Sequence, residues 1–561
     1  MLLSYLQYSK ARVRKQRERD ERITKLPAVY HQSLSDADKT ILNTPLSTLI
    51  NNVQSGIWTP TNVLHAYGRK TLSVHAQTNC LTEVFIGDAD VWASDVNANL
   101  TLKKTGPLAG VPVSLKDSIA VAGYDACIGY AAWVGRPVQR DSAIVRLLRD
   151  AGALLYVKTA IPTTLLSFES YSGVFGRCTN PHNSSFSPGG STGGDAALIA
   201  AGGARVGLGT DIAGSVRVPA HYSGIYSVRS SVGRFPKSGN VSSNPGIEGV
   251  PSSTSPLART LEDLETFWAA VFQMEPWKYD HSVLRIPWKP VTLPEGKVRF
   301  GVMWDDGVVP LSPACRRALQ SVVDNLRRKG YEVFDFAPSD PYEGLKVASQ
   351  LILADGGETV LGPLLPGEPN DPGMVSASFW LRLPCFLRNI YIWWVKYFRR
   401  DSIYAGLLKA LYKKSVAEVY KLVAEREKYK ALWHEAWNKS GMDFLLTAPN
   451  ALPAVPHGGM KNGWKVCGYT FLFNLLDYTA GVQPITHVSA SLDAMTKSTP
   501  VATNQIAKEA FAMYDARAMD GLPVGVQVVG RRLEEEKVLA GMRLIENIMK
   551  ENGQGYELLE V

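Results

Sequence analysis

Apolar and polar residues follow helical spacing and short continuous runs in turn along most of the chain. Apolar positions over 144–148 predict a helix that Asp141 caps, and Gly152 ends it before an apolar strand at 153–157. Thr59 before Pro60 predicts another helix start. The same order of helix, glycine and strand recurs. It predicts helices at 313–329 and 414–439 and strands at 331–336, 444–447 and 522–529.

Strands that alternate with helices indicate an α/β protein with a central sheet covered by helices on both faces. Residues 5–23 hold seven Lys or Arg mixed with three acids, which predicts a solvated, highly charged helix. The sequence contains neither a fixed-period repeat nor a clear linker. We therefore expect a helical arm over 1–40 and a single domain over 41–561.

Composition narrows the class of protein without changing this picture. Of 561 residues, 45% are hydrophobic and 20% charged, as in ordinary folded proteins, and the net charge of +8 is too dilute for a nucleic-acid surface. The six cysteines are scattered, which predicts reduced thiols. The apolar residues at the start precede the charged ones, the reverse of a signal peptide, so we expect a cytoplasmic protein.

Glycine is concentrated in one stretch, with nine in the 26 positions 189–214 against 48 in the whole chain. Such density favours backbone amides presented to a ligand, because glycine allows close approach. A phosphate-binding loop would need a lysine after the glycines, and none follows. The GxSxG pattern around Ser191 fits a nucleophile elbow, but loop-forming residues precede it where a strand is required.

A third interpretation uses Lys116 as a base. This lysine follows the apolar segment 111–115, where burial would lower its pKa and let it activate a serine hydroxyl. For a lone lysine, an ion pair with Asp117 would be the simpler explanation.

Three segments in order resemble the amidase signature family. They are GVPVSLKD at 110–117, GGSTGGD at 189–195 and GTDIAGSVRVP at 209–219, with 75 residues from Lys116 to Ser191 and 24 from Ser191 to Ser215. These spacings resemble those of fatty acid amide hydrolases, and 273–280 is similar to fungal acetamidases. The resemblance covers about residues 40 to 550, with a signature core at about 107–240.

The resemblance implies an amidase-signature fold with a central mixed, twisted sheet, and a role for each matching residue. Ser215 would be the nucleophile that forms the acyl-enzyme, and Ser191, held by a cis peptide, would pass protons between it and neutral Lys116. Backbone N–H groups would form the oxyanion hole, and Leu165 would line the acyl pocket. The expected oxyanion-hole residues are Ile212, Ala213, Gly214 and Ser215. Neither a metal nor a cofactor is expected.

Two positions depart from the family pattern. Thr192 replaces a serine and keeps a hydroxyl for a supporting hydrogen bond. Ala213 replaces a glycine, and would be strained if that position required a positive φ. Asp211 and Arg217 match the motif, and we interpret them as holding the loop.

An aromatic and basic segment interrupts the domain at about 375–412. Eight of the twenty residues 379–398 are aromatic, and no acid lies between Asp371 and Asp401. Its longest uncharged run is too short to span a bilayer, but the segment could lie at a membrane surface, about where fatty acid amide hydrolases carry a membrane cap. A buried helix pair or a homodimer contact, with the arginines reaching outward, is the simpler explanation.

The sequence therefore predicts an amidase that converts a small-molecule carboxylic amide to an acid and ammonia or an amine. Two alternatives stay open. An esterase would use the same acyl-enzyme, and a membrane-peripheral binding protein would result if Ala213 had disabled the oxyanion hole.

Overall fold

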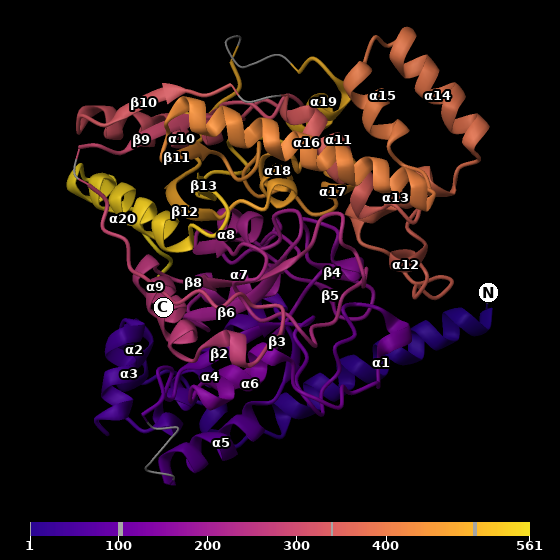
Figure 1. Ribbon diagram of the computed structural model, residues 1–561. Helices are drawn as coiled ribbons and strands as arrows, with labels where there is room; N and C mark the ends of the chain where they lie inside the picture. Colours follow the sequence, from indigo (N-terminus) through magenta and orange to yellow (C-terminus); the bar gives the residue numbers. More distant parts are fainter. Residues whose placement is uncertain (1, 99–104, 295, 338–339, 497–501) are drawn as a thin grey trace.

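The computed structural model describes residues 2–98, 105–294, 296–337, 340–496 and 502–561. An eleven-stranded mixed sheet runs through the molecule, and helices pack against both of its faces (Figure 1). The α/β prediction is confirmed. The strand order is β1-β3-β2-β6-β8-β7-β12-β13-β11-β9-β10.

Parallel pairing joins β3, β2 and β6 on one side of the sheet and β11, β9 and β10 on the other. The strands between them pair antiparallel, as does the edge strand β1 with β3. The strands of this sheet are β1 Leu81–Val84, β2 Pro112–Lys116, β3 Leu154–Thr159, β6 Val206–Asp211, β7 Tyr226–Arg229, β8 Ser253–Ala258, β9 Arg299–Val302, β10 Glu332–Asp335, β11 Phe444–Thr447, β12 Ala480–His487 and β13 Pro523–Val529. A separate two-stranded ribbon consists of β4 Tyr171–Ser172 and β5 Gly176–Arg177.

The helices of the first half of the chain are α1 Leu2–Thr24, α2 Asp36–Asn43, α3 Leu46–Gln54, α4 Pro60–Thr78, α5 Ile86–Ala98, α6 Ala143–Asp150, α7 Gly193–Ala200, α8 Arg217–Ser223 and α9 Leu261–Gln273. Those of the second half are α10 Pro313–Arg328, α11 Pro341–Ile352, α12 Glu358–Leu361, α13 Pro372–Arg382, α14 Cys385–Tyr397, α15 Ser402–Lys409, α16 Val416–Ser440, α17 Met460–Gly463, α18 Gly468–Leu476, α19 Gln505–Phe511 and α20 Glu535–Glu551.

Of the two predicted helix caps, one is confirmed and the other is wrong. Thr59 caps α4 with a reciprocal capping box to Asn62, as its sequence predicts. The prediction that Asp141 caps α6 is wrong, because Ser142 occupies the cap position. The carboxylate of Asp141 instead accepts a hydrogen bond from the backbone N–H of Ala122, which ties the helix start to the loop after β2.

The N-terminal helix α1 lies along one side of the molecule (Figure 1). Its helical prediction is confirmed, but part of it is buried. Lys15 is 1% exposed and pairs with the carboxylates of Glu83 and Asp125, the latter at 2.9 Å. Tyr8 and Arg19 are buried as well, so α1 presents a packed face to the rest of the chain.

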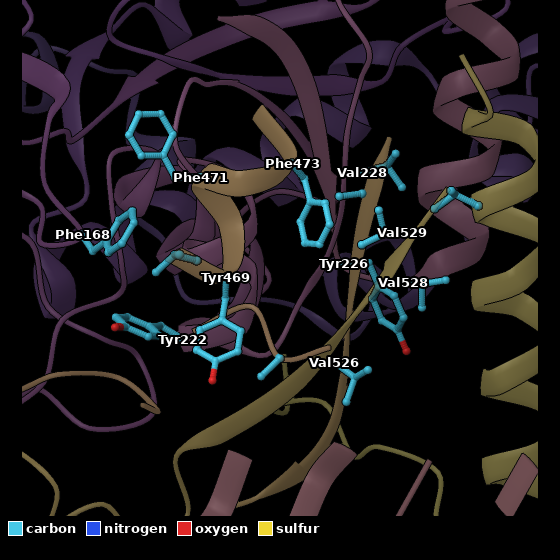
Figure 2. Close-up of a cluster of buried hydrophobic side chains, with 14 of the residues drawn as sticks. Phe168, Tyr222, Tyr226, Val228, Tyr469, Phe471, Phe473, Val526, Val528 and Val529 are labelled. Carbon is cyan, nitrogen blue, oxygen red and sulfur yellow. The ribbon is translucent and has the colours of Figure 1, made fainter. Parts of the chain in front are cut away.

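Helix α18 carries aromatic side chains to two regions of the core. Figure 2 shows Phe473 beside Val228 and Val529 of the sheet, and Phe471 on the other side of the helix, near Phe168. All five side chains are buried. Helix α18 thus separates the core of the sheet from a region lined by Phe168 and Phe471.

The aromatic and basic segment forms α13 and α14, which with α15 project from the body (Figure 1). The interpretation as a buried helix pair is wrong for most of its apolar residues. Eight large apolar side chains are 42–69% exposed. They are Phe379, Phe386, Leu387, Ile390, Trp393, Trp394, Tyr397 and Phe398. Within the described chain no helix is long and apolar enough to cross a membrane.

Candidate active site

Strand β2 brings Lys116 into the interior at its carboxyl end. The strand is fully buried between β3 and β6, and Lys116 is 0% exposed. Its Nζ lies 2.7 Å from Ser191 Oγ and 2.9 Å from Thr210 Oγ1. An ion pair with Asp117 does not form, since that carboxylate accepts from the Ile128 N–H and faces Lys158.

Burial decides the charge of Lys116. It lowers the pKa of the amine to about 7, because the interior disfavours the charged form, and the carboxylates of Asp211 and Asp195 oppose this only in part. At neutral pH a large share of the molecules therefore carries a neutral amine in contact with the Ser191 hydroxyl. A neutral amine in this position can accept a proton.

Ser191 lies in the glycine-rich loop before α7, and the Gly190–Ser191 peptide bond is cis. A Cβ at Gly190 would collide with the backbone oxygens of Ser167 and Glu169, so only glycine fits there. The next residue, Thr192, donates its N–H to Ser215 O over 3.1 Å. Its hydroxyl, expected to make a supporting hydrogen bond, is buried with no partner among the described residues.

Ser215 follows β6 in the loop that leads into α8. The Gly214 N–H, expected in the oxyanion hole, donates to Asp211 Oδ1 over 2.8 Å. Among the described residues, the N–H groups of Ile212, Ala213 and Ser215 donate to no protein acceptor. The Ser191 and Ser215 hydroxyls, both within the described part of the chain, form no hydrogen bond with each other.

The strain anticipated at Ala213 does not occur, because its φ is not positive. The residue that needs the left-handed region is Gly214, with φ 122°. A Cβ there would also collide with Thr470, whose hydroxyl donates to Ala213 O over 2.7 Å. The glycine that this loop cannot lose is therefore present.

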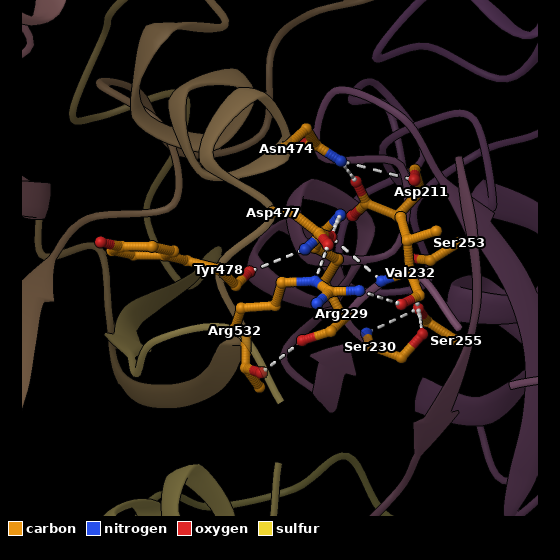
Figure 3. Close-up of polar contacts among 12 residues, drawn as sticks. Asp211, Arg229, Ser230, Val232, Ser253, Ser255, Asn474, Asp477, Tyr478 and Arg532 are labelled. Atoms are coloured by element: carbon orange, nitrogen blue, oxygen red, sulfur yellow. Dashed lines mark hydrogen bonds and ion pairs between the residues drawn. The ribbon is translucent and has the colours of Figure 1, made fainter. Parts of the chain in front are cut away.

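A buried ion pair between Arg217 and Asp211 stabilises the loop that carries Ser215. The Arg217 Nη2 lies 3.0 Å from Asp211 Oδ1, and both side chains are 0% exposed. Burial opposes ionisation of Asp211, but the guanidinium holds its pKa well below the usual range. Asn474 of α18 donates to the same carboxylate over 2.8 Å (Figure 3), and Arg217 also donates to Gln527 of β13.

Two cavities meet at these residues, and both are lined by Leu165, Ile212 and Ser215. A narrow apolar cavity of about 110 Å³ extends toward α11, α13 and α15. A wider polar cavity of about 490 Å³ is lined by Ser191 and by residues of the 237–248 loop. Leu165 thus lines the same two cavities as Ser215, and its role in an acyl pocket stays a prediction.

Thr210 is a contact of Lys116 that the sequence analysis missed. Its hydroxyl and its carbonyl oxygen lie 2.9 Å and 3.2 Å from Nζ. Its position just before Asp211, at the end of an apolar strand, is the sequence feature that could have indicated this contact. Among the described residues, no group of three or more His, Cys, Asp or Glu could hold a metal ion.

Comparison with known proteins agrees with this arrangement of motifs. The amidase family model matches residues 62–539, most of the chain. The chain belongs to the amidase signature family. An acetamidase of Aspergillus oryzae is 31% identical over 524 residues, covering 90% of each chain. The fatty-acid amide hydrolase 1 of Sus scrofa is 32% identical, covering 91% of this chain and 86% of the relative.

A solved structure of a fatty acid amide hydrolase superposes with a TM-score of 0.85 and 25% identity, covering 98% of this chain and 96% of that one. This amidase-signature protein is therefore a hydrolase that acts on amide bonds.

The loop geometry makes a prediction about two adjacent positions. Gly214→Ala should lower activity strongly and reduce stability by about 1–3 kcal/mol, because it adds backbone strain and a clash with Thr470. Ala213→Gly should change stability by no more than about 1 kcal/mol. Denaturant unfolding and amide turnover of the two variants check this. Equal behaviour of the two would contradict the assignment of the strained position.

Proposed function

We propose that this amidase hydrolyses its substrate through Lys116, Ser191 and Ser215 by way of an acyl-enzyme. The observation that supports this is the contact between a buried amine, poised to be neutral, and the hydroxyl of Ser191 beside a cavity that Ser215 also lines. Neutral Lys116 accepts the Ser191 proton while Ser191 accepts the Ser215 proton. Ser215 Oγ then attacks the amide carbon.

The negative oxygen formed by this attack lies where unpaired backbone donors can receive it. We assign the contacts to the N–H groups of Ile212, Ala213 and Ser215, because Gly214 is engaged by Asp211. Such donors stabilise the charge that develops in the transition state. When the tetrahedral intermediate collapses, Ser191 passes its proton to the leaving amine and regains one from Lys116. Water later releases the acid.

The two cavities suit different parts of the substrate. The apolar one is lined by Ser215 and by the apolar side chains of Phe168, Phe471 and Leu407, so it is suited to an apolar acyl group longer than acetyl. The polar one contains Ser191 and suits the leaving amine and the incoming water. We assign acyl and amine binding accordingly.

The φ angle of Ala213 is not positive, so this residue gives no reason to expect a disabled oxyanion hole. The alternative of a membrane-peripheral binding protein rested on that expectation. An esterase remains the alternative within the same mechanism. Amide leaving groups need the proton from Ser191 more than ester leaving groups do. Ser191→Ala should therefore slow amides more than matched esters if the protein is an amidase in practice.

The decisive experiment measures acid release from primary amides of rising chain length, from acetamide to oleamide. Ser215→Ala should reduce kcat/KM for the preferred amide by about 10⁴–10⁶-fold, since members of such a catalytic unit fail together. Ser185→Ala, at an exposed serine, is the matched control. Retention of wild-type turnover by Ser215→Ala would overturn the proposal.

The charge state of Lys116 makes a prediction about pH. Only the neutral amine can accept the Ser191 proton, so kcat/KM should rise about tenfold per pH unit below about 7 and level off above it. Asp195, whose pKa burial raises to about 7, lies close enough to broaden this step. Lys116→Met should remove both the activity and this ionisation. A wild-type profile that still rises up to the ordinary pKa of lysine would contradict the assignment.

We also propose that the exposed apolar face of α13 and α14 contacts a membrane surface. Phe386, Ile390 and Trp393 are more than half exposed, and Arg382 and Lys396 are exposed nearby. Rings at headgroup level and basic residues near anionic lipid are typical of helices that lie in the interface. Helix α13 also lines the apolar cavity through Met374.

Vesicle sedimentation tests this contact. The chain should bind vesicles that contain phosphatidylserine, less strongly at high salt, and Phe386→Asp together with Trp393→Asp should abolish binding. Val13→Asp, at an exposed apolar residue of α1, is the control. If the double variant instead converts a dimer to a monomer and vesicles never bind, the face is a homodimer contact.

A further inference from the structure

Lys465 lies in the wall of the apolar cavity, between α17 and α18. It is 6% exposed, and its neighbours along this wall include Leu407, Met460 and Phe471. The same cavity reaches Ser215. Burying the amine of a lysine in an apolar lining costs free energy unless a hydrogen-bond acceptor or an opposite charge compensates it.

The amine of Lys465 stands apart from the other buried lysines. Five lysines in the described part of the chain are less than 9% exposed, and four of them have hydrogen-bond partners. These four are Lys15, Lys116, Lys158 and Lys414. Within that same part of the chain, Lys465 Nζ has no hydrogen-bond partner.

Aromatic rings and distant charges make up the surroundings of this amine. Its Nζ lies 3.8 Å from the ring centre of Trp464 and 4.6 Å from that of Tyr404. Glu509, Cys467 and Asp401 act on it through space, but none of them forms a hydrogen bond with it. Asp401 is engaged instead by the N–H groups of Tyr404 and Gln505.

Ring faces attract a cation but offer no lone pair in the geometry of a hydrogen bond. The three donors of the ammonium group are therefore unused in the free protein. Burial lowers the pKa of Lys465 well below its ordinary value, because the interior disfavours the charged form of the amine. The Nζ atom has almost no exposed surface, so an anion in the cavity reaches it once the amine turns away from the two rings. The anion would then supply both the missing acceptor and the missing charge.

We infer that Lys465 is a specificity-determining residue that binds a carboxylate at the far end of the acyl group, so that monoamides of dicarboxylic acids are preferred substrates. The inference rests on the proposed function, in that the acyl group lies in the apolar cavity. The apolar lining contacts the methylene groups, and Lys465 contacts the terminal carboxylate. Where the free amine is neutral, binding takes up one proton from solvent, and no covalent bond changes.

Paired substrates test this selectivity. Each monoamide from succinamic to sebacamic acid is compared with the plain amide of equal carbon number, such as adipamic acid with hexanamide. The wild type should favour the acid-bearing amide at one chain length. Lys465→Met should lower that preference about 10–100-fold, the range for a charged hydrogen bond, while hydrolysis of the plain amide is kept.

Lys461→Met, at an exposed lysine four residues earlier, should leave the preference unchanged. Lys465→Arg should restore part of it, because it returns the charge. Replacement of a buried charge by an apolar side chain of similar volume is often neutral or stabilising, so Lys465→Met should fold. If it does not, competitive inhibition of the wild type by adipate at rising pH gives the answer, since it should weaken as the amine loses its proton.

A binding measurement separates this inference from the proposed function. Calorimetry with adipate on Ser215→Ala, in buffers of different ionisation enthalpy, should show proton uptake that Lys465→Met removes. If adipate binds in this way but no amide is hydrolysed, the proposed function fails and the anion site stands. If plain amides are hydrolysed but neither preference nor binding depends on Lys465, the inference on Lys465 is overturned.

Discussion

The site depends on a lysine that is buried without a carboxylate in direct contact. Among the residues that the structure describes, the Lys116 amine forms hydrogen bonds only with oxygens of Ser191 and Thr210. Burial then keeps the pKa of this amine near neutrality. Two carboxylates close by are engaged elsewhere. Arg217 neutralises Asp211, and Asp195 accepts hydrogen bonds from the hydroxyls of Ser114 and Thr159. A direct ion pair would hold Lys116 charged and unable to accept a proton.

The Asp211 carboxylate connects this electrostatic arrangement to the shape of the loop. It accepts from the backbone of Gly214 and Val216, so the turn that presents Ser215 is held by the group that Arg217 neutralises. Asn474 and Gln527, far away in the sequence, complete the network from α18 and β13. The position of the Ser215 loop therefore depends on contacts from distant elements as well as on its own segment.

Helix α18 serves both the network and the substrate cavity. Asn474 faces Asp211, Thr470 contacts Ala213 O, and Phe471 lines the apolar cavity, all within two turns. Lys465, just before this helix, gives the same cavity its unpartnered amine. One short segment thus links the geometry of the loop to the lining of the apolar cavity.

The sequence by itself determined the α/β class, the family, and the pairing of Lys116 with Ser191. Glycine spacing and apolar runs are local signals, and three ordered motifs identify a shared ancestry. Tertiary structure alone decided which donors of the loop are unpaired, because the Asp211 carboxylate that takes the Gly214 N–H is itself held by Asn474 of α18. It also decided that Ala213 is unstrained, that α1 is partly buried, and that α13 and α14 expose their aromatic rings. These outcomes depend on φ angles and on contacts between distant segments, and neither is encoded in the local pattern of residues.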